Sequence, residues 1–323
     1  IDMSIKSFGN PNARYKATMS RTGDFRNPLQ LYYGDRGIFA AGYGGGSHVN
    51  TIDYITISSA GNATDFGDTI TGKSGRAACS NVTRGIIAGG SGGHNEIEYI
   101  TISTPGNGTD FGDLTQGRYA PAGNASSTGR GIFGGGGSTT NIIDYITIST
   151  TGNATDFGDL TRVVDEPAGV SNGKRGVFAG GYGPAPSYTA QNTMDYVTID
   201  TTGDASDFGD LSKIWQGIHG CGNVDDRGLM GSGKNGPSNT HTDEIVYITI
   251  STTGNSQDFG DLTQARNGAM SCANGIRCTW GGGAYPNTSQ NTIDYVTMAT
   301  TGNAQDFGDL TQARQYTEGC SGD

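Results

Sequence analysis

The chain has 323 residues, of which 56 are glycine, and its 31 acidic against 20 basic residues give a net charge of −11. That much glycine excludes a helical bundle or a long coiled coil, because each glycine inside a helix costs about 1 kcal/mol relative to alanine. No apolar run approaches the ~20 residues that span a bilayer, so no membrane insertion is expected. The acidic balance also disfavours nucleic acid as a partner.

The main feature of the sequence is an internal repeat. A segment reading Ile-Asp-Tyr-Ile-Thr-Ile-Ser, then Thr-Gly-Asn-Ala, then Asp-Phe-Gly-Asp-Leu-Thr recurs six times with small changes, and its phenylalanines are 45 to 51 residues apart. The phenylalanines are Phe66, Phe111, Phe157, Phe208, Phe259 and Phe307. This period is typical of propeller blades or of long solenoid repeats.

In chain order, each unit contains four predicted strands. Strand a is a run of small residues such as 77–80, and strand b begins with Arg-Gly and ends in glycines, as in 84–90. Strand c is a β-branched and aromatic run such as 143–148, and strand d surrounds Asp-Phe-Gly-Asp. These residue types favour a pleated sheet, and Gly-Asn or Gly-Asp marks the turn between c and d. No segment has an apolar period of 3.6 residues, so helices should be nearly absent.

Four antiparallel strands per unit predict an all-β propeller of four-stranded blades rather than a solenoid, and a closed ring leaves few exposed strand edges. We expect one domain over 1–323: degenerate strands of a closing blade in 1–28, six repeats in 29–315, and strand a of the closing blade in 316–323. This count favours seven blades, with six as the alternative. It also predicts a native chain that extends beyond both ends and continues after Asp323 with an Arg-Gly-apolar run.

The double glycine that ends strand b, the Tyr of strand c and the aromatic residue of strand d resemble the kelch repeat over residues 29–323. Phe stands in every unit where kelch has Trp, and Ala41-Gly42 and Ser232-Gly233 depart from the double glycine. The strings DYITISTTGNATDFGDLT and RGVFAGG are also similar to repeat proteins of tailed bacteriophages of marine cyanobacteria. That second resemblance implies a phage-encoded, virion or extracellular protein.

Nearly all variation in repeat length falls between strands b and c. In an antiparallel blade the b–c loops and the d–a connections emerge on one face, which suits a rigid scaffold with a variable binding surface. Aromatic and histidine side chains on these loops could stack on sugar rings or pack the loops. The candidate ligand-binding residues are Tyr43, His48, Tyr182, Tyr188, Trp215, His241 and Tyr285.

The repeated acidic residues of Asp-Phe-Gly-Asp raise the question of a calcium site. Carboxylates can bind calcium, and the first candidates are Asp65, Asp68, Asp110 and Asp113. Their repetition in every unit favours a structural role in turns, so no cofactor is expected and calcium stays an alternative. The arginine that opens each strand b could contribute to an anion-binding ring, but it is rather expected to bridge blades by pairing with a carboxylate or with carbonyl groups.

The five cysteines are scattered, and none forms a Cys-x-x-Cys pair. Cys79, Cys221, Cys272 and Cys320 share one register in strand a, so we expect small buried side chains rather than disulfides. Cys278 replaces the glycine of strand b and should also be buried.

The sequence carries no recognisable catalytic motif. Together with the phage resemblance, this absence leads us to expect a non-enzymatic virion propeller of the tail-fibre kind, whose receptor is a glycan or another molecule on the host surface. One alternative is a structural decoration or fibre module that docks other virion proteins. Another is a glycan-processing enzyme with carboxylates such as Asp165-Glu166 or Asp243-Glu244. Assembly into a homo-oligomer is left open.

Overall fold

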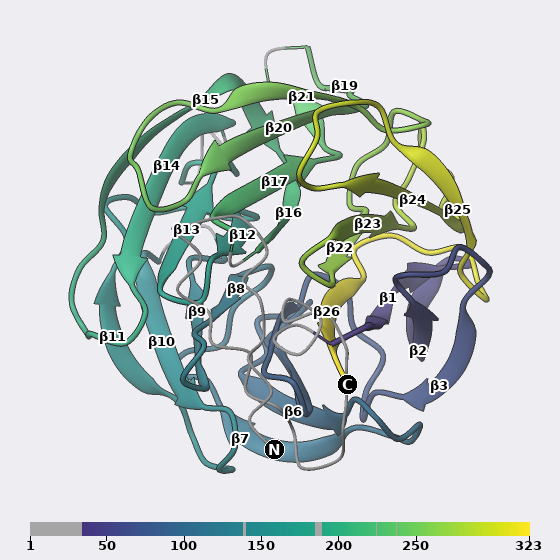
Figure 1. Cartoon of the computed structure of the whole chain (residues 1–323). Helices are drawn as coiled ribbons and strands as arrows, with labels where there is room; N and C mark the ends of the chain where they lie inside the picture. The colour runs from purple at the N-terminus through teal and green to yellow at the C-terminus, as the bar shows by residue number, and fades with distance from the viewer. Residues whose placement is uncertain (1–33, 138–139, 185–188, 224, 237) are drawn as a thin grey trace, which may run out of the picture.

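Six antiparallel sheets surround a single axis in the computed structural model (Figure 1). The structure describes residues 34–137, 140–184, 189–223, 225–236 and 238–323. Every regular element in that part is a strand, which confirms the all-β prediction for these residues. Within the same ranges there is no helix with the length and apolarity to cross a bilayer.

Each sheet is a blade whose four main strands follow one another from the axis outward. Blade 1 is β26 (Glu318–Gly322), β1 (Arg36–Gly44), β2 (Ser47–Thr56) and β3 (Thr64–Asp68); blade 2 is β4 (Ala77–Ser80), β5 (Arg84–Ala88), β6 (Glu96–Thr101) and β7 (Thr109–Asp113); blade 3 is β8 (Ala122–Ala125), β9 (Arg130–Gly134), β10 (Ile142–Thr147) and β11 (Thr155–Asp159). Blade 4 is β12 (Ala168–Ser171), β13 (Arg175–Ala179), β14 (Gln191–Thr198) and β15 (Ser206–Gln216); blade 5 is β16 (His219–Gly222), β17 (Arg227–Gly231), β20 (Glu244–Thr249) and β21 (Gln257–Asp261); blade 6 is β22 (Met270–Ala273), β23 (Arg277–Gly281), β24 (Thr292–Thr297) and β25 (Gln305–Asp309). The predicted a, b, c and d strands match these elements in order.

The C-terminal strand closes the ring. β26 pairs antiparallel with β1, with Ile38 opposite Cys320, and the Asp35 amide donates a 2.8 Å hydrogen bond to the Asp323 carboxylate. The seven-blade prediction is therefore wrong, and the six-blade alternative is confirmed. The strand b that pairs with the C-terminal strand is β1, which begins with Arg36 and Gly37, while the extension of the native chain beyond both ends stays a prediction. Residues 1–28, expected to be strands of a seventh blade, and residues 29–33, at the start of the first expected repeat, lie outside the described residues.

The blades pack face to face through apolar side chains. Phe111 of β7 and Ile86 of β5 contact Phe133 and Ile146 of the next blade in one buried cluster, and equivalent clusters join other pairs of blades. Near the axis, small residues let the a strands approach each other. A Cβ at Gly123 would lie only 2.1 Å from the carbonyl oxygen of Ala78 in the neighbouring blade.

The outer edge of each blade is covered by the next blade. The Gly152 and Ala154 amides in the c–d turn of blade 3 each donate a 2.8 Å hydrogen bond to strand d of blade 2, at the carbonyls of Phe111 and Asp113. Similar bonds hold each of the other strands d, including that of blade 6, which bonds to the turn of blade 1. The glycine of Asp-Phe-Gly-Asp is required at this contact, because a Cβ at Gly112 would lie 2.5 Å from the Gly152 carbonyl oxygen. These turns protect strand edges that would otherwise be open to pairing with another chain.

The arginines that open strand b also join blades. Arg84 stacks over Tyr99 of its own blade, with 4.3 Å from the guanidinium carbon to the ring centroid, and donates a 3.2 Å hydrogen bond to the Ile148 carbonyl of the next blade. All six units repeat this arrangement. The expected bridging role of the six arginines is confirmed.

One cysteine pair departs from the sequence prediction. Cys221 of β16 and Cys278 of β23 form a disulfide across 57 residues, whereas the sequence predicted none. The prediction compared strand-a cysteines with one another, but the side chain at this position points to strand b of the next blade. There it meets the second residue of the strand: a Cβ at Gly131 would lie 2.6 Å from Cys79 Sγ. Cys278 replaces the equivalent glycine in blade 6. Cys79, Cys272 and Cys320 are free and buried, as expected.

Candidate functional site

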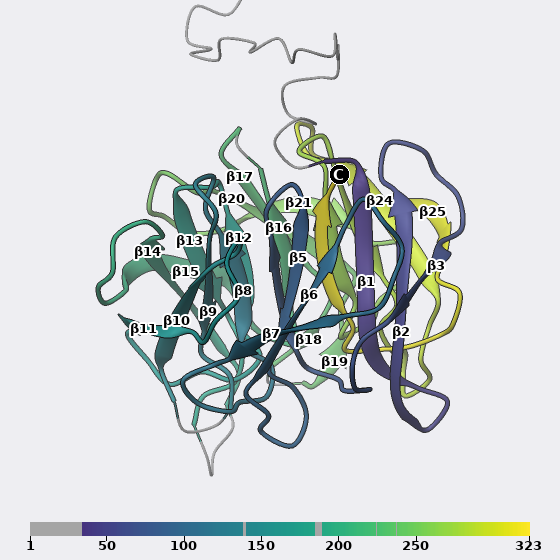
Figure 2. The same ribbon diagram turned by 90° about the horizontal axis from the view of Figure 1, so that it is seen from below.

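The b–c loops and the d–a connections lie together on one face of the ring, at the bottom of Figure 2. This is the face on which the sequence placed its binding residues. β15 is unusually long and continues onto this face, where it pairs with β18 (Lys234–Asn235), and β18 pairs with β19 (Thr240–His241). The b–c loop of blade 5 thus extends the sheet of blade 4.

Four of the candidate residues form two aromatic pairs on this face. The rings of Tyr43 and His48, and those of His241 and Tyr285, meet edge to face with centroids 5.4 Å apart in each pair. The Tyr285 side chain is 44% exposed. Tyr182 is half-buried and its backbone pairs with Asp165 in the d–a connection that leads to blade 4. Tyr188 lies outside the described residues.

Trp215, the remaining candidate, does not reach the loop surface. Its side chain has no exposed area and packs in the core between blades 4 and 5 with Ile218 and Val246. In blade 6 the equivalent positions hold Arg266 and Asp294, which form a buried ion pair of 2.7 Å. Blade 5 therefore replaces a buried ion pair by an apolar pair, and Trp215 has a packing role.

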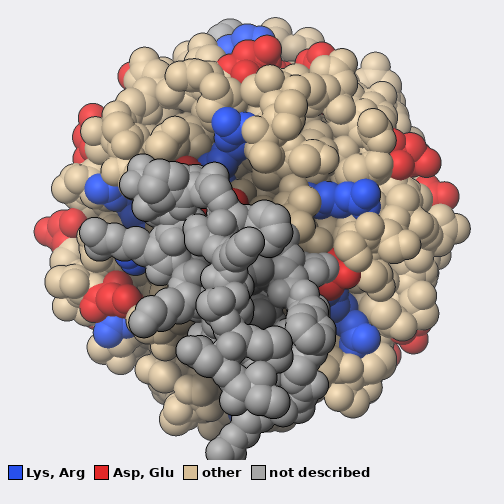
Figure 3. All heavy atoms as spheres, in the orientation of Figure 1, with Lys and Arg blue, Asp and Glu red and all other residues tan. Residues whose placement is uncertain are grey.

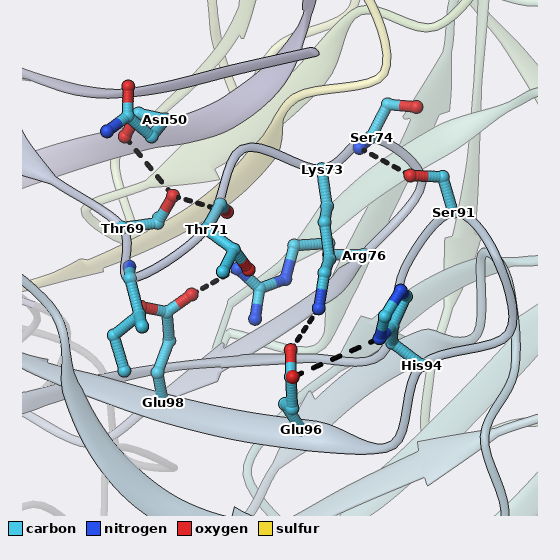
Figure 4. Close-up of polar contacts among 11 residues, drawn as sticks. Asn50, Thr69, Thr71, Lys73, Ser74, Arg76, Ser91, His94, Glu96 and Glu98 are labelled. Carbon is cyan, nitrogen blue, oxygen red and sulfur yellow. Dashed lines mark hydrogen bonds and ion pairs between the residues drawn. The ribbon is translucent and has the colours of Figure 1, made fainter.

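Buried ion pairs recur at the other blade interfaces, between an arginine of the d–a connection and an acid of strand c. They are Arg76–Glu98, Arg118–Asp144, Arg162–Asp195, Arg266–Asp294 and Arg314–Asp53. In Figure 4, Arg76 and Lys73 point from the β3–β4 connection toward Glu98 and Glu96 on β6. Since its carboxylate partner holds each of these arginines, their positive charge is already neutralised inside the protein.

The d–a connections surround the mouth of the axial channel. Their seventh residue after Asp-Phe-Gly-Asp has a positive φ in every blade: Gly75, Ala120, Glu166, Gly217, Gly268 and Tyr316. Glycine takes this conformation easily, whereas Glu166 at φ 53° and Tyr316 at φ 52° do so at a cost of about 1 kcal/mol or more. Two large polar side chains are thus held at the channel mouth against local backbone preference.

Two polar pairs lie around this mouth, and we call their four residues the collar: Tyr119, Glu166, Asn267 and Tyr316. The Tyr119 hydroxyl donates a hydrogen bond to the Glu166 carboxylate. The Asn267 side-chain amide donates a 3.0 Å hydrogen bond to the Tyr316 hydroxyl, and its carbonyl oxygen lies 2.9 Å from His241 Nε2. The pair of half-buried His241 and exposed Tyr285 is therefore linked through Asn267 to the channel mouth.

Beneath the collar lies a cavity of about 60 Å³ on the axis. Glu166 and Tyr316 line it together with Glu318, Arg76 and His219. Glu318 is 5% exposed, and its Oε1 has no hydrogen-bond partner among the described residues; the same holds for His219 Nε2 and Arg76 Nε. His219 begins strand a of blade 5, and Glu318 begins strand a of blade 1. Arg76 precedes strand a of blade 2.

Burial alters the proton affinity of these groups. It raises the pKa of Glu318 well above its usual value and, helped by the Asp165 charge, raises the pKa of Glu166 to about 7. Burial also raises the pKa of Tyr316 to about 12 and lowers that of His219 to about 4. At neutral pH the histidine is therefore uncharged, while Glu166 is divided between its two protonation states.

The opposite end of the channel has a different chemistry. A cavity of about 160 Å³ is lined there by small residues at the ends of the a strands, such as Ser80, Ala125 and Ser321. Figure 3 shows the face around this end; on the atoms that are not grey, basic and acidic side chains are dispersed among uncharged ones. The convergence of tyrosines and acids is a property of the loop face.

The acidic residues proposed for calcium lie on the outermost strands. Asp65 and Asp110 are exposed, and the backbone amides of Asp68 and Asp113 donate hydrogen bonds of 3.0 and 3.1 Å to Asn107 and Asn153 of the next blade. In these contacts an asparagine side chain accepts the hydrogen bond from the aspartate backbone. The sequence had instead predicted that the aspartate side chains would stabilise the turns. Among the described residues no group of three or more His, Cys, Asp or Glu side chains is arranged to hold a metal ion.

Sequence reasoning missed most of the collar and of the cavity beneath it. Tyr119, Tyr316, His219 and Glu318 stand in short connections or small-residue strands that resemble scaffold. A signal was available, because the blades can be aligned on Asp-Phe-Gly-Asp. Strand a begins with alanine in blades 2, 3 and 4 but with His219, Met270 and Glu318 in blades 5, 6 and 1. A large side chain at a position that is small in the other blades indicates a role beyond the packing of the blade.

No protein-family model matches the chain, and no curated protein matches it in sequence. The blade structure itself is consistent with the kelch-like repeat that the sequence resembles. The chain is thus a six-bladed β-propeller of four-stranded blades, with a loop face that gathers tyrosine, histidine and carboxylate side chains around its axis.

Proposed function

We propose that this propeller is an adhesion module, displayed on a phage particle, that binds a host-surface glycan through the face of b–c loops and d–a connections. The observation that supports it best is the link from half-buried His241, which contacts the exposed Tyr285 ring, through Asn267 to Tyr316 at the channel mouth. Aromatic faces beside hydrogen-bonding groups in a concave mouth suit the alternating apolar and polar surfaces of a sugar.

The scaffold supports this role. Six interlocked blades hold the loops on a rigid ring, so little conformational entropy is lost when a ligand binds. The interblade disulfide is of the kind that persists in oxidising surroundings, which fits an extracellular particle.

Binding to a glycan array and to intact candidate host cells tests the proposal. We expect saturable binding by the purified propeller, and a loss of at least about tenfold in affinity for the double variant His241→Ala, Tyr285→Ala, because it removes an aromatic contact and its partner. Lys174→Ala is the matched control, since Lys174 is exposed in an a–b turn on the opposite face. Absence of binding to every glycan and cell would overturn the proposal and favour a module that docks other virion proteins. Hydrolysis of a bound glycan would instead favour the enzyme alternative.

A further inference from the structure

We propose that the cavity beneath the collar is a subsite for a primary ammonium group, and that the glycan recognised by this face carries an amino sugar with a free amine. This inference rests on the proposed function for the source of the amine. The cavity itself is defined by Glu166, Tyr316, Glu318, Arg76 and His219, independently of what carries the ligand.

The first argument is charge. Three carboxyl groups meet at this end of the channel: Glu318 in the cavity, Glu166 at its edge and Asp165 beside it. Among the described residues that line the cavity, the single arginine, Arg76, is already paired with Glu98, and His219 is neutral at physiological pH. A buried carboxylate that lacks a cation must either keep its proton or take up a positive ligand. The charge of Arg76 acts on Glu318 but is shared with Glu98, so the three carboxyl groups outnumber the cation that lines the cavity, and an ammonium group would supply a further positive charge.

The second argument is unmet hydrogen bonding. Glu318 is 95% buried, and its Oε1 accepts no hydrogen bond from any described residue. Such an oxygen costs roughly 1–3 kcal/mol unless a partner arrives. An ammonium has three N–H donors, and Glu318 Oε1 and Glu166 are acceptors that line the same cavity.

The third argument is size and shape. A cavity of about 60 Å³ holds a few water-sized groups, enough for an ammonium and the carbon that bears it but not for a whole sugar ring. Met270 and Pro121 also line the cavity and offer apolar contact to that carbon, while the Tyr316 ring is the kind of surface that attracts a cation. The rest of a saccharide would lie outside, against the collar and the His241–Tyr285 pair.

The test compares a glucosamine trisaccharide with the N-acetylglucosamine trisaccharide by isothermal titration calorimetry. Acetylation removes the charge but keeps the sugar backbone. We expect the free-amine form to bind at least about tenfold more tightly, as an ammonium that meets buried carboxylates should. Methylammonium chloride should compete with it, whereas equal concentrations of potassium or calcium chloride should not.

Two variants locate the effect. Glu318→Gln and Glu166→Gln should each reduce the preference for the free amine to about twofold or less, while binding of the acetylated form changes little. Glu166→Gln serves if the buried Glu318 variant fails to fold, as circular dichroism would show. The control is Asp156→Asn, which removes an exposed carboxylate on the outermost strand of blade 3.

Proton release on ligand binding is a measurement that would not change if these acids had only a structural role. At pH 6, entry of the ammonium should displace a proton from Glu166, whose surroundings include Asp165, Lys234 and Tyr119, or from Glu318, which Arg76 faces. Titrations in buffers of different ionisation enthalpy should report up to one proton released for wild type and less for Glu166→Gln.

The outcomes separate this inference from the proposed function. Equal affinity for the two trisaccharides, an unchanged preference in both glutamate variants, or equal competition by potassium would overturn the ammonium subsite. If neither trisaccharide binds but other glycans do, the subsite is rejected and glycan binding stands. If no glycan and no cell surface is bound, both proposals fail.

Discussion

At the scale of single residues, the molecule separates charges that are matched from charges that are not. Buried arginines at the blade interfaces each face an acid, as Arg314 faces Asp53 at 3.0 Å. Glu166 of the collar is an exception, because it lies beside Asp165 and no described arginine or lysine forms an ion pair with it, although the charge of Lys234 acts on it. The buried charges of the blade interfaces are thus paired, and the unpaired acid belongs to the loop face.

Glu166 should make stability depend on pH. Its pKa rises from about 4.5 when unfolded to about 7 in the fold, so the folded chain binds more protons in this window and loses stability as pH rises through it. We expect Glu166→Gln to be more stable than wild type at pH 8, by on the order of 1–3 kcal/mol, and equal to it near pH 4. Thermal unfolding at the two pH values measures this. A variant that is less stable at pH 8 would contradict the assignment.

The natural exchange in blade 5 predicts how the ion pairs respond to mutation. Asp294→Val alone should cost about 3–5 kcal/mol, because it leaves Arg266 buried without a counter-charge. The double variant Arg266→Trp, Asp294→Val copies Trp215 and Val246 and should recover most of that loss. Denaturant midpoints followed by circular dichroism give both values. If the double variant is as unstable as the single one, the equivalence of the two interfaces is wrong.

At the scale of elements, each strand d depends on a turn of the next blade. Hydrogen bonds such as that of 2.8 Å from the Gly302 amide to the Phe259 carbonyl close the edge of one sheet with the backbone of another. This explains why the c–d turns are near copies: each must fit the strand of a neighbour as well as its own. The b–c loops do not have to fit a neighbouring strand in this way, and most of the variation in repeat length falls in them.

Two glycines in this contact allow a matched comparison. Gly260 and Gly302 have φ of 147° and 157°, but a Cβ at Gly260 would lie 2.5 Å from the Gly302 carbonyl oxygen, whereas one at Gly302 would meet nothing within 4 Å. Gly260→Ala should therefore destabilise the protein by about 1–3 kcal/mol more than Gly302→Ala. Melting temperatures measure the difference. Equal losses would show that backbone strain, and not the interblade contact, dominates.

The cysteine register predicts a second disulfide. Gly131→Cys places a thiol beside Cys79 as Cys278 lies beside Cys221, and the bond would close a loop of about 50 residues. Chain entropy sets an upper value of about 4 kcal/mol for the gain. Mass spectrometry should show the loss of two hydrogens on oxidation, and melting should rise only without reductant. Gly131→Ser is the control, and a reactive thiol at position 131 after oxidation would refute the register.

At the scale of the whole molecule, the sequence predicted the strands of each blade correctly but not the number of blades in the ring. The period, the strand order and the bridging arginines follow from local patterns that each unit repeats. The number of blades depends on which strand the C-terminal segment meets, and that pairing joins Glu318 to Ala40, which are far apart in sequence. The Cys221–Cys278 bond and the collar were missed for the same reason, since each is made by side chains of different blades.

The closure by β26 has a further consequence for assembly. The inner strand of blade 1 comes from the far end of the sequence, so β1 of one molecule presents the same edge to its own C-terminal strand and to that of another copy. Refolding at high concentration should therefore yield strand-exchanged dimers, in which each C-terminal segment completes the partner's ring. Size-exclusion chromatography after refolding at a series of concentrations would reveal them, and covalent linkage of residue 36 to residue 322 through paired cysteines should abolish them. The inner edge of β1 is thus covered either by the C-terminal strand of the same molecule or by that of another copy. The protein concentration during folding decides between the two.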